Sequence, residues 1–258
     1  MPVALRLGVS ANAVSVAGLV TGAGAAMSYA RFGDWRFALL GLLLSVAWLI
    51  ADGLDGMVAR ATKTASALGR VLDGLCDHGV FLLIYLALAI TIGTPEGWLL
   101  ALAAGVAHAF QSSFYEGERG RFHRRAQGLA LIGGQSTSTN AFVRFYDSVA
   151  GLPEQMAGAF ERRLAASSEP ATLGMRYAAA AVGPMRLLSL ETANVRVLAI
   201  FVACLLGDPR LFWWFEIGPL TFVAIIGFLW HRRIERSLLL VSHPAPADAP
   251  ARYLVKEQ

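Results

Sequence analysis

The sequence predicts an all-α integral membrane protein, and three observations support that prediction. Hydrophobic residues make up 56% of the 258 residues and charged residues only 16%, with a mean hydropathy of +0.54. These values lie outside the usual range for a soluble domain. Six apolar stretches are long enough to cross a hydrocarbon core of about 30 Å. The basic residues fall almost entirely between alternate stretches.

We expect one bundle of six transmembrane helices within a catalytic domain at residues 1–240. The spans are expected near 11–30, 36–58, 71–92, 96–116, 188–206 and 211–230. In the first span, Gly18 and Gly22 have the spacing of small residues that lets helices approach closely. No internal repeat of fixed period is apparent, which disfavours transporters built from duplicated halves.

The basic residues also set the orientation. One set of loops holds most of them, including the cluster Arg119–Arg125, whereas the opposite loops hold only Arg31, Arg36 and Arg210. The positive-inside rule therefore places both termini in the cytoplasm, in a multi-pass protein of the inner (cytoplasmic) membrane. The net charge of +4 is explained by this topology and by attraction to anionic lipid, so we expect no nucleic-acid partner.

One large insertion, at about 117–187, interrupts the spans on the cytoplasmic side. It begins with the basic "RGRFHRRAQG" and the polar "GGQSTSTN". Apolar residues then recur at helical spacing: Phe142, Phe145, Tyr146, Val149, Met156, Phe160 and Leu164. We expect interfacial helices here, and the alternative is a surface loop with no role in the chemistry. The tail at 241–258 contains three prolines and is expected to be disordered.

The stretch "ADGLDGMVARATKTASALGRVLDGLCD" at 51–77 carries four aspartates between two apolar runs: Asp52, Asp55, Asp73 and Asp77. At about 100° per residue, the first two share a stripe of the second span and the last two a stripe of the third. The short polar linker "TKTAS" makes these spans antiparallel neighbours. Because clustered carboxylates in a membrane are costly and repel one another, we expect a hard divalent cation with a diphosphate substrate.

Small residues accompany these acids. Gly56, Ala59 and Gly69 leave room for a ligand against the backbone, and Arg60 offers a forked donor to a phosphate oxygen. The alternative is a structural network in which the four acids pair with nearby basic residues.

The pattern Asp-x-x-Asp-Gly-x-x-Ala-Arg, eight residues, then Gly-x-x-x-Asp-x-x-x-Asp occupies residues 52–77. It resembles the signature of the CDP-alcohol phosphotransferases, membrane enzymes of phospholipid synthesis, at all nine fixed positions. The resemblance extends to the six-span layout with the motif at the cytoplasmic face. A basic residue often follows the last aspartate in that family, and this chain has His78 there.

This resemblance implies that a hydroxyl attacks the β-phosphoryl of a CDP-linked donor and releases CMP. It implies two divalent ions, Mg²⁺ or Mn²⁺, with Asp52, Asp55 and Asp73 as ligands. Asp77 would complete the metal site and act as general base. The CDP moiety would be contacted by further residues of the pattern and before the first span: Gly56, Ala59, Arg60, Gly69 and Asn12. The family also makes a homodimer a candidate assembly.

The acceptor site is expected elsewhere in the bundle. Arg196 falls well inside the fifth span, and the fourth span ends in polar residues that include His108, Gln111, Tyr115 and Glu116. We expect these to bind the acceptor's hydroxyls or phosphate, with Arg196 on an anionic group. The alternatives are a structural pair between Arg196 and Glu191, and the ordinary polarity of a helix end near the interface.

The resemblance favours a CDP-diacylglycerol donor, embedded in membrane lipid, and a small polar acceptor. The reverse arrangement, a soluble CDP-alcohol with a lipid acceptor, stays open. Two other classes also use helix-borne acids. A membrane prenyltransferase would normally have two separated acidic motifs, whereas this chain has one, and a metal-ion transporter would not need Gly56, Ala59, Arg60 and Gly69 at these spacings.

Overall fold

The structure is a computed structural model that describes residues 11–62, 67–131 and 158–240, without the side chains at 11–12, 59–60 and 67–77. Every regular element in these ranges is helical, as the sequence predicts. In chain order the elements are α2 (Ala11–Tyr29), α3 (Trp35–Ala61), α4 (Ala67–Ile92), α5 (Pro95–Ala126), α8 (Gly158–Ala165), α9 (Pro170–Leu188), the 3₁₀ turn η1 (Ser189–Glu191), α10 (Ala193–Leu205), α11 (Arg210–Phe215), the π-helical turn η2 (Glu216–Leu220) and α12 (Thr221–Leu240).

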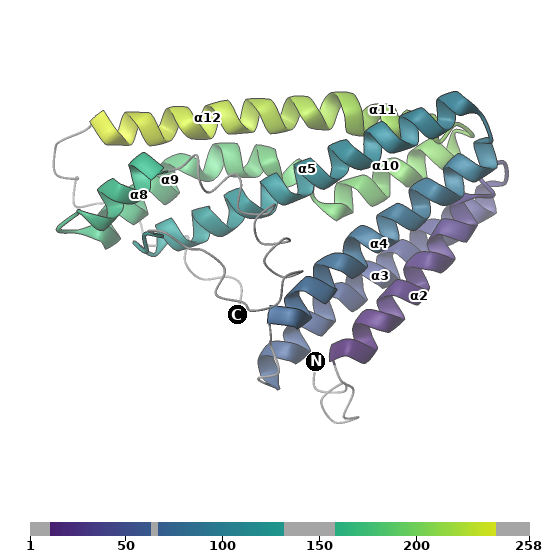
Figure 1. Cartoon of the computed structure of the whole chain (residues 1–258), viewed down its shortest axis with the longest axis horizontal. Coiled ribbons are helices and arrows are strands. Elements are labelled where there is room, and N and C mark those ends of the chain that lie inside the picture. Colours follow the sequence, from purple (N-terminus) through teal and green to yellow (C-terminus); the bar gives the residue numbers. More distant parts are fainter. Residues whose placement is uncertain (1–10, 63–66, 132–157, 241–258) are drawn as a thin grey trace.

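The first three helices form one group because α2 packs against both α3 and α4 (Figure 1). A Cβ atom at Gly22 would lie only 2.3 Å from a methyl carbon of Val80 on α4, and one at Gly18 would lie 3.4 Å from Ala51 on α3. The close approach expected at these glycines is therefore confirmed. It brings the start of α2, the end of α3 and the start of α4 to the same end of the group (Figure 1).

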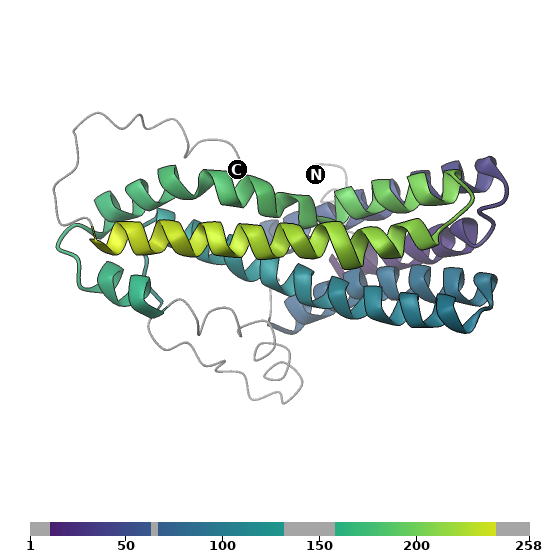
Figure 2. The ribbon, with the colours of Figure 1, turned by 90° about the horizontal axis from the view of Figure 1, so that it is seen from above.

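The turn between α4 and α5 follows from its sequence. Gly93 adopts φ +66°, the left-handed conformation that glycine tolerates at a helix end. Thr94 then caps α5, since its hydroxyl accepts from the Gly97 N–H at 3.1 Å, and Pro95 occupies the first turn. From this turn α5 leaves α4 and runs beside α9 and α12 (Figures 1 and 2).

The insertion contains more helix than the sequence predicts. α5 continues to Ala126, ten residues past the expected end at 116, and α9 occupies residues that we expected to connect the spans. α9 crosses the end of α5 closely, since a Cβ atom at Gly174 would lie 2.3 Å from the Arg125 carbonyl oxygen. In α8, Phe160 and Leu164 are each 1% exposed and pack against Tyr177 of α9. The expected helical residues from Phe142 to Met156 lie outside the described residues.

The outer surface is apolar, as expected of a protein in lipid. Large apolar side chains stand exposed on most of the helices in the predicted spans, for example Val20, Leu43, Leu102, Leu198 and Phe222, each more than half exposed. The main core lies inside, between α2, α3, α4, α10 and α11, around Trp48, Ile84 and Trp213.

By length and composition, two helical segments in the described ranges could cross a membrane: Trp35–Val58 and Arg210–Leu240. A third is added if the pair Pro170–Glu191 and Ala193–Leu205, bent by 42°, counts as one span. Each of the six predicted apolar stretches is helical, but the six-span layout and the cytoplasmic termini stay predictions. The polar residues His108 and Gln111 in the predicted fourth span lower its hydropathy.

Candidate active site

Four acid positions lie at the shared end of α2, α3 and α4. Asp55 on α3 is only 5% exposed, and its Oδ2 accepts a hydrogen bond from the Ser15 hydroxyl of α2 at 2.5 Å. Asp52 lies one turn earlier on α3 and is half-buried. Asp73 and Asp77 lie in the first three turns of α4, and their side chains are outside the described residues. The backbone thus gathers the four positions, as the spacing predicts.

The carboxylates of Asp52 and Asp55 are oxygen ligands of the kind that a hard divalent cation takes, so the residues present fit the predicted metal. Among the side chains that the structure describes, no three His, Cys, Asp or Glu groups come together as a metal site. Two of the four expected ligands are not among those side chains. Of the expected CDP contacts, Gly56 follows Asp55 on α3. The side chains of Asn12, Ala59 and Arg60, and the surroundings of Gly69, fall outside the description.

A second polar site lies deeper between the helices, and we call it the Glu216 cluster: Tyr85, His108, Gln111, Arg196 and Glu216. The Glu216 side chain is fully buried. Its Oε1 accepts from Arg196 Nε at 3.0 Å and from the Tyr85 hydroxyl at 3.1 Å. His108 Nδ1 lies 3.4 Å from the same oxygen. Gln111 donates to the Glu216 carbonyl at 3.0 Å and accepts from Arg196 Nη2 at 2.9 Å.

Local sequence explains why Glu216 can serve four elements. Pro219 lies inside the turn, and its missing N–H removes one α-helical hydrogen bond. The helix widens there into a π turn, a distortion that is frequent at functional sites. The carbonyl of Glu216 then accepts from a side chain of α5.

The cluster joins three of the five residues expected at the acceptor site: Arg196, His108 and Gln111. The remaining Arg196 nitrogen, Nη1, donates to the backbone carbonyl of Glu191, so each guanidinium nitrogen has a protein acceptor. Neither carboxylate oxygen of Glu191 has a hydrogen-bond partner in the described part of the chain. The structure therefore gives Arg196 a different side-chain partner, Glu216, from the one that the structural alternative named.

Tyr115 and Glu116 lie apart from the cluster. The Glu116 side chain is 63% exposed and pairs with Arg119 at 3.6 Å, and Tyr115 packs against the small core around Phe114 and Leu188. Their contact with an acceptor stays a prediction. The sequence analysis missed Glu216 and Tyr85, although Glu216 is a charged residue inside a predicted span and so met the criterion that selected Arg196.

Residues 9–114 match the family model described as CDP-alcohol phosphatidyltransferase. Over this segment the chain belongs to that family. Family members are transferases of substituted phosphate groups and generally depend on a divalent metal. The match spans α2, α3, α4 and the first part of α5, and it contains all nine signature positions. Neither the search of curated proteins nor the search of solved structures found a match.

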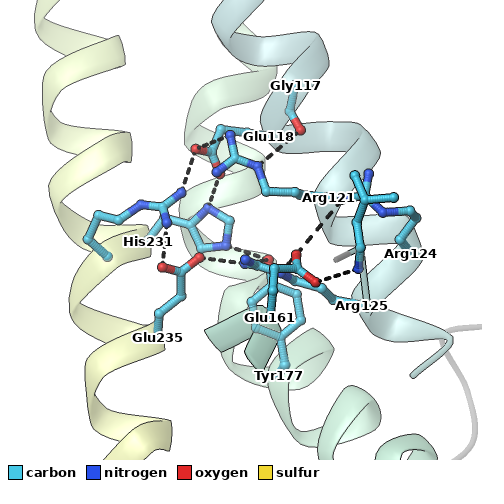
Figure 3. Close-up of polar contacts among 11 residues, drawn as sticks. Gly117, Glu118, Arg121, Arg124, Arg125, Glu161, Tyr177, His231 and Glu235 are labelled. Atoms are coloured by element: carbon cyan, nitrogen blue, oxygen red, sulfur yellow. Dashed lines mark hydrogen bonds and ion pairs between the residues drawn. The ribbon is translucent and has the colours of Figure 1, made fainter. Parts of the chain in front are cut away.

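Beyond the matched segment, the transferase has a buried set of ionised side chains at the far end of α5 (Figure 3). We call it the charge cluster, and it joins α5 to α8, α9 and α12. Its members are Glu118, Arg121, Arg124, Arg125, Glu161, Tyr177, His231, Arg232 and Glu235.

Arg125 holds the insertion to both neighbouring helices. Its Nε donates to Glu161 of α8 at 2.8 Å and its Nη1 to Glu235 of α12 at 2.5 Å. The guanidinium also lies over the Phe160 ring, 4.9 Å from the centroid, a favourable cation–π position. Arg125 is fully buried, so its two carboxylate partners supply the compensation that a buried charge requires.

Glu118 is the acidic centre of the same cluster. Its carboxylate lies 2.5 Å from His231 Nδ1, 2.8 Å from Arg232 and 3.1 Å from Arg121. Burial raises the pKa of Glu118, but the hydrogen bond from His231 and the charge of Arg121 outweigh it and lower the pKa to about 2. With Nδ1–H given to Glu118, His231 Nε2 accepts from the Tyr177 hydroxyl at 2.6 Å. The transferase thereby ties α9 and α12 to α5.

Proposed function

We propose that the protein makes a phospholipid by moving a phosphatidyl group from CDP-diacylglycerol to the hydroxyl of a small polar acceptor, with release of CMP. The observation that supports this proposal is the nine-position signature, which lies inside the family-matched segment. The buried Asp55 beside Ser15 agrees with a built site at the shared end of α2–α4.

In this proposal the aspartates have distinct roles. Asp52, Asp55 and Asp73 hold the divalent ions, with Asp77 completing their site. Bound Mg²⁺ or Mn²⁺ would neutralise charge on the diphosphate and on the departing CMP. Asp77 takes the proton from the attacking hydroxyl.

The CDP moiety would bind against the small residues of the signature. Gly56, Ala59 and Gly69 admit it to the helix backbones, and Arg60 and Asn12 donate to its phosphate and polar groups. For the acceptor, the Glu216 cluster is the favoured place, because it gathers buried hydrogen-bonding groups from α4, α5, α10 and η2. Arg196 is then the residue that organises the acceptor site.

We also propose that the protein crosses the inner membrane six times and faces the cytoplasm with its active site. The exposed apolar surface supports burial in lipid, and the arginine-rich ends of α5 and α12 support a cytoplasmic location for those ends. This places the charge cluster at the cytoplasmic side.

The test is CMP release by the purified protein with CDP-diacylglycerol and Mg²⁺, against a panel of acceptors: glycerol phosphate, inositol, inositol phosphate and serine. A parallel reaction with a soluble CDP-alcohol and diacylglycerol tests the reverse arrangement. We expect CMP and a new phospholipid with one polar acceptor. Asp77→Asn should lower turnover by about 10²- to 10⁴-fold, and Asp34→Asn, an exposed acid outside the signature, should leave it unchanged. No CMP with any acceptor would contradict the proposal.

A further inference from the structure

A groove lies between α4 and α5, and it has a volume of about 420 Å³. This volume falls in the range of small-molecule sites. Its walls are apolar: Leu82 and Leu86 from α4 face Leu102 and Val106 from α5. Gly105 lies in the α5 wall and contributes no side chain there. We call this feature the α4–α5 groove.

The two imidazoles of the groove lie at the same end. His78 and His108 line that end with their rings edge to face, 5.8 Å between centroids. The opposite end is lined by Ala89 of α4 and Trp98 of α5. The groove therefore has the polarity of an amphipathic ligand with one polar end and an apolar body.

The length of the groove matches one acyl chain. On α4 it extends from His78 to Ala89 and on antiparallel α5 from Ala109 to Trp98, which is about 16 Å at 1.5 Å per residue. That is about half the hydrocarbon thickness of a bilayer, the depth occupied by the chains of one leaflet. Leu82, Leu102 and Val106 are each more than half exposed, so a chain could enter sideways from lipid.

The polar end also leads to the candidate active site. His78 directly follows Asp77, the last aspartate of the signature. A lipid whose diphosphate lies at the aspartates would therefore have its glycerol near His78 and an acyl chain in line with the groove.

We propose that the α4–α5 groove binds one acyl chain of the CDP-linked lipid donor, with the polar head of that lipid beside His78. This inference rests on the proposed function and identifies the lipid as the donor, not the acceptor. The other occupants, bulk membrane lipid and a second copy of this chain, predict different results in the tests below.

The first test fills the groove. A Cβ atom at Gly105 would meet Tyr85 at 3.9 Å, an ordinary contact, so Gly105→Ala should fold and serve as a backbone control. Gly105→Phe places a ring in the groove. Ala103→Phe adds the same bulk at an exposed position of α5 that does not line the groove, and is the matched control.

For Gly105→Phe we expect the KM for a dipalmitoyl donor to rise about tenfold, as for the loss of about two buried methylene groups. A dibutanoyl donor, whose chains are too short to reach Gly105, should keep its KM. Ala103→Phe should change neither value. Equal chain-length dependence in the two phenylalanine variants would overturn the groove assignment while leaving the transferase activity established.

The second test does not depend on turnover. A donor with a diazirine at the end of one acyl chain is bound to the unmodified protein and irradiated. We expect the label on the α4 and α5 peptides, and its loss when unlabelled donor is added in excess. Label on other helices, or label that excess donor does not displace, would overturn the proposal. So would a disulfide between two copies through Leu102→Cys that forms equally with and without donor.

These results separate the two levels of the argument. If the unmodified protein releases no CMP from either donor, the proposed function fails, and the displaceable label alone decides whether the groove binds a CDP-linked lipid. If Gly105→Phe does not fold, the label on the unmodified protein again decides.

Discussion

Removing Arg196 without replacing its charge should destabilise the protein strongly. The Arg196 side chain is 1% exposed and that of Glu216 is fully buried, so Arg196→Met leaves a carboxylate in the interior without its cation. Breaking such a pair typically costs about 3–5 kcal/mol. Gln111 and the Glu191 carbonyl would lose a donor as well, so we expect the upper half of that range.

A double-mutant cycle tests the reason for the loss. Arg196→Met combined with Glu216→Met removes both charges and fills their space with apolar atoms, so the double variant should be more stable than Arg196→Met alone. Denaturant unfolding in a lipid–detergent mixture, followed by tryptophan fluorescence, measures each free energy of unfolding. Arg210→Ala is the control, because Arg210 and Asp208 form an exposed pair at 2.8 Å whose loss should not be measurable.

Two results would refute this reasoning. A loss below about 1 kcal/mol in Arg196→Met would mean that Glu216 is not a buried charge that needs Arg196. Additive losses in the double variant would mean that the two side chains act independently. Kinetics add a separate readout: if Arg196 organises the acceptor site, Arg196→Lys should raise the KM of the acceptor and leave the KM of the CDP-linked donor nearly unchanged.

Three further predictions concern the metal, the aspartates and pH. Chelator treatment should abolish CMP release and added Mg²⁺ or Mn²⁺ should restore it, so full turnover in chelated enzyme would contradict the metal assignment. Asp77→Asn should lower turnover by about 10²- to 10⁴-fold with donor binding retained, whereas Asp55→Ala should weaken metal-dependent nucleotide binding in equilibrium titrations. Because the pKa of Glu118 is lowered from 4.5 to about 2, its stabilisation is complete above pH 4.5 and is lost as the pH falls toward 2, by about 3 kcal/mol in total. Glu118→Gln should remove that slope from acid unfolding curves, and an unchanged slope would show that other groups cause it.

The helices of the apolar stretches were predictable because apolar runs of this length have few other solutions in lipid. α9 was not, since Arg176, Arg186 and Pro184 interrupt its apolar sequence. Pro170 at its first turn was a usable signal. The extension of α5 was missed for a different reason. Its arginines were interpreted as topology signals, although Glu118, Arg121 and Arg125 are spaced three and four residues apart, as on one helix face.

The candidate site divides in the same way. The positions of Asp52, Asp55, Asp73 and Asp77 follow from spacing along two helices joined by a short linker, so sequence alone places them at one end. The partner of Arg196 lies twenty residues away in the chain, beyond a turn, and no spacing rule pairs residues across such a distance. Only the packing of α10 against the π turn selects Glu216.

The π turn at Glu216–Leu220 also determines how this protein can change length during evolution. Glu216 on one side of it, and His231 and Glu235 on the other, all meet partners on α5. Deleting one residue from the turn would restore regular helix but rotate everything after it by about 100°, which would carry His231 and Glu235 away from those partners. A one-residue deletion here, although it hardly alters the length of the helix, would therefore disconnect the membrane-buried cluster from the charge cluster.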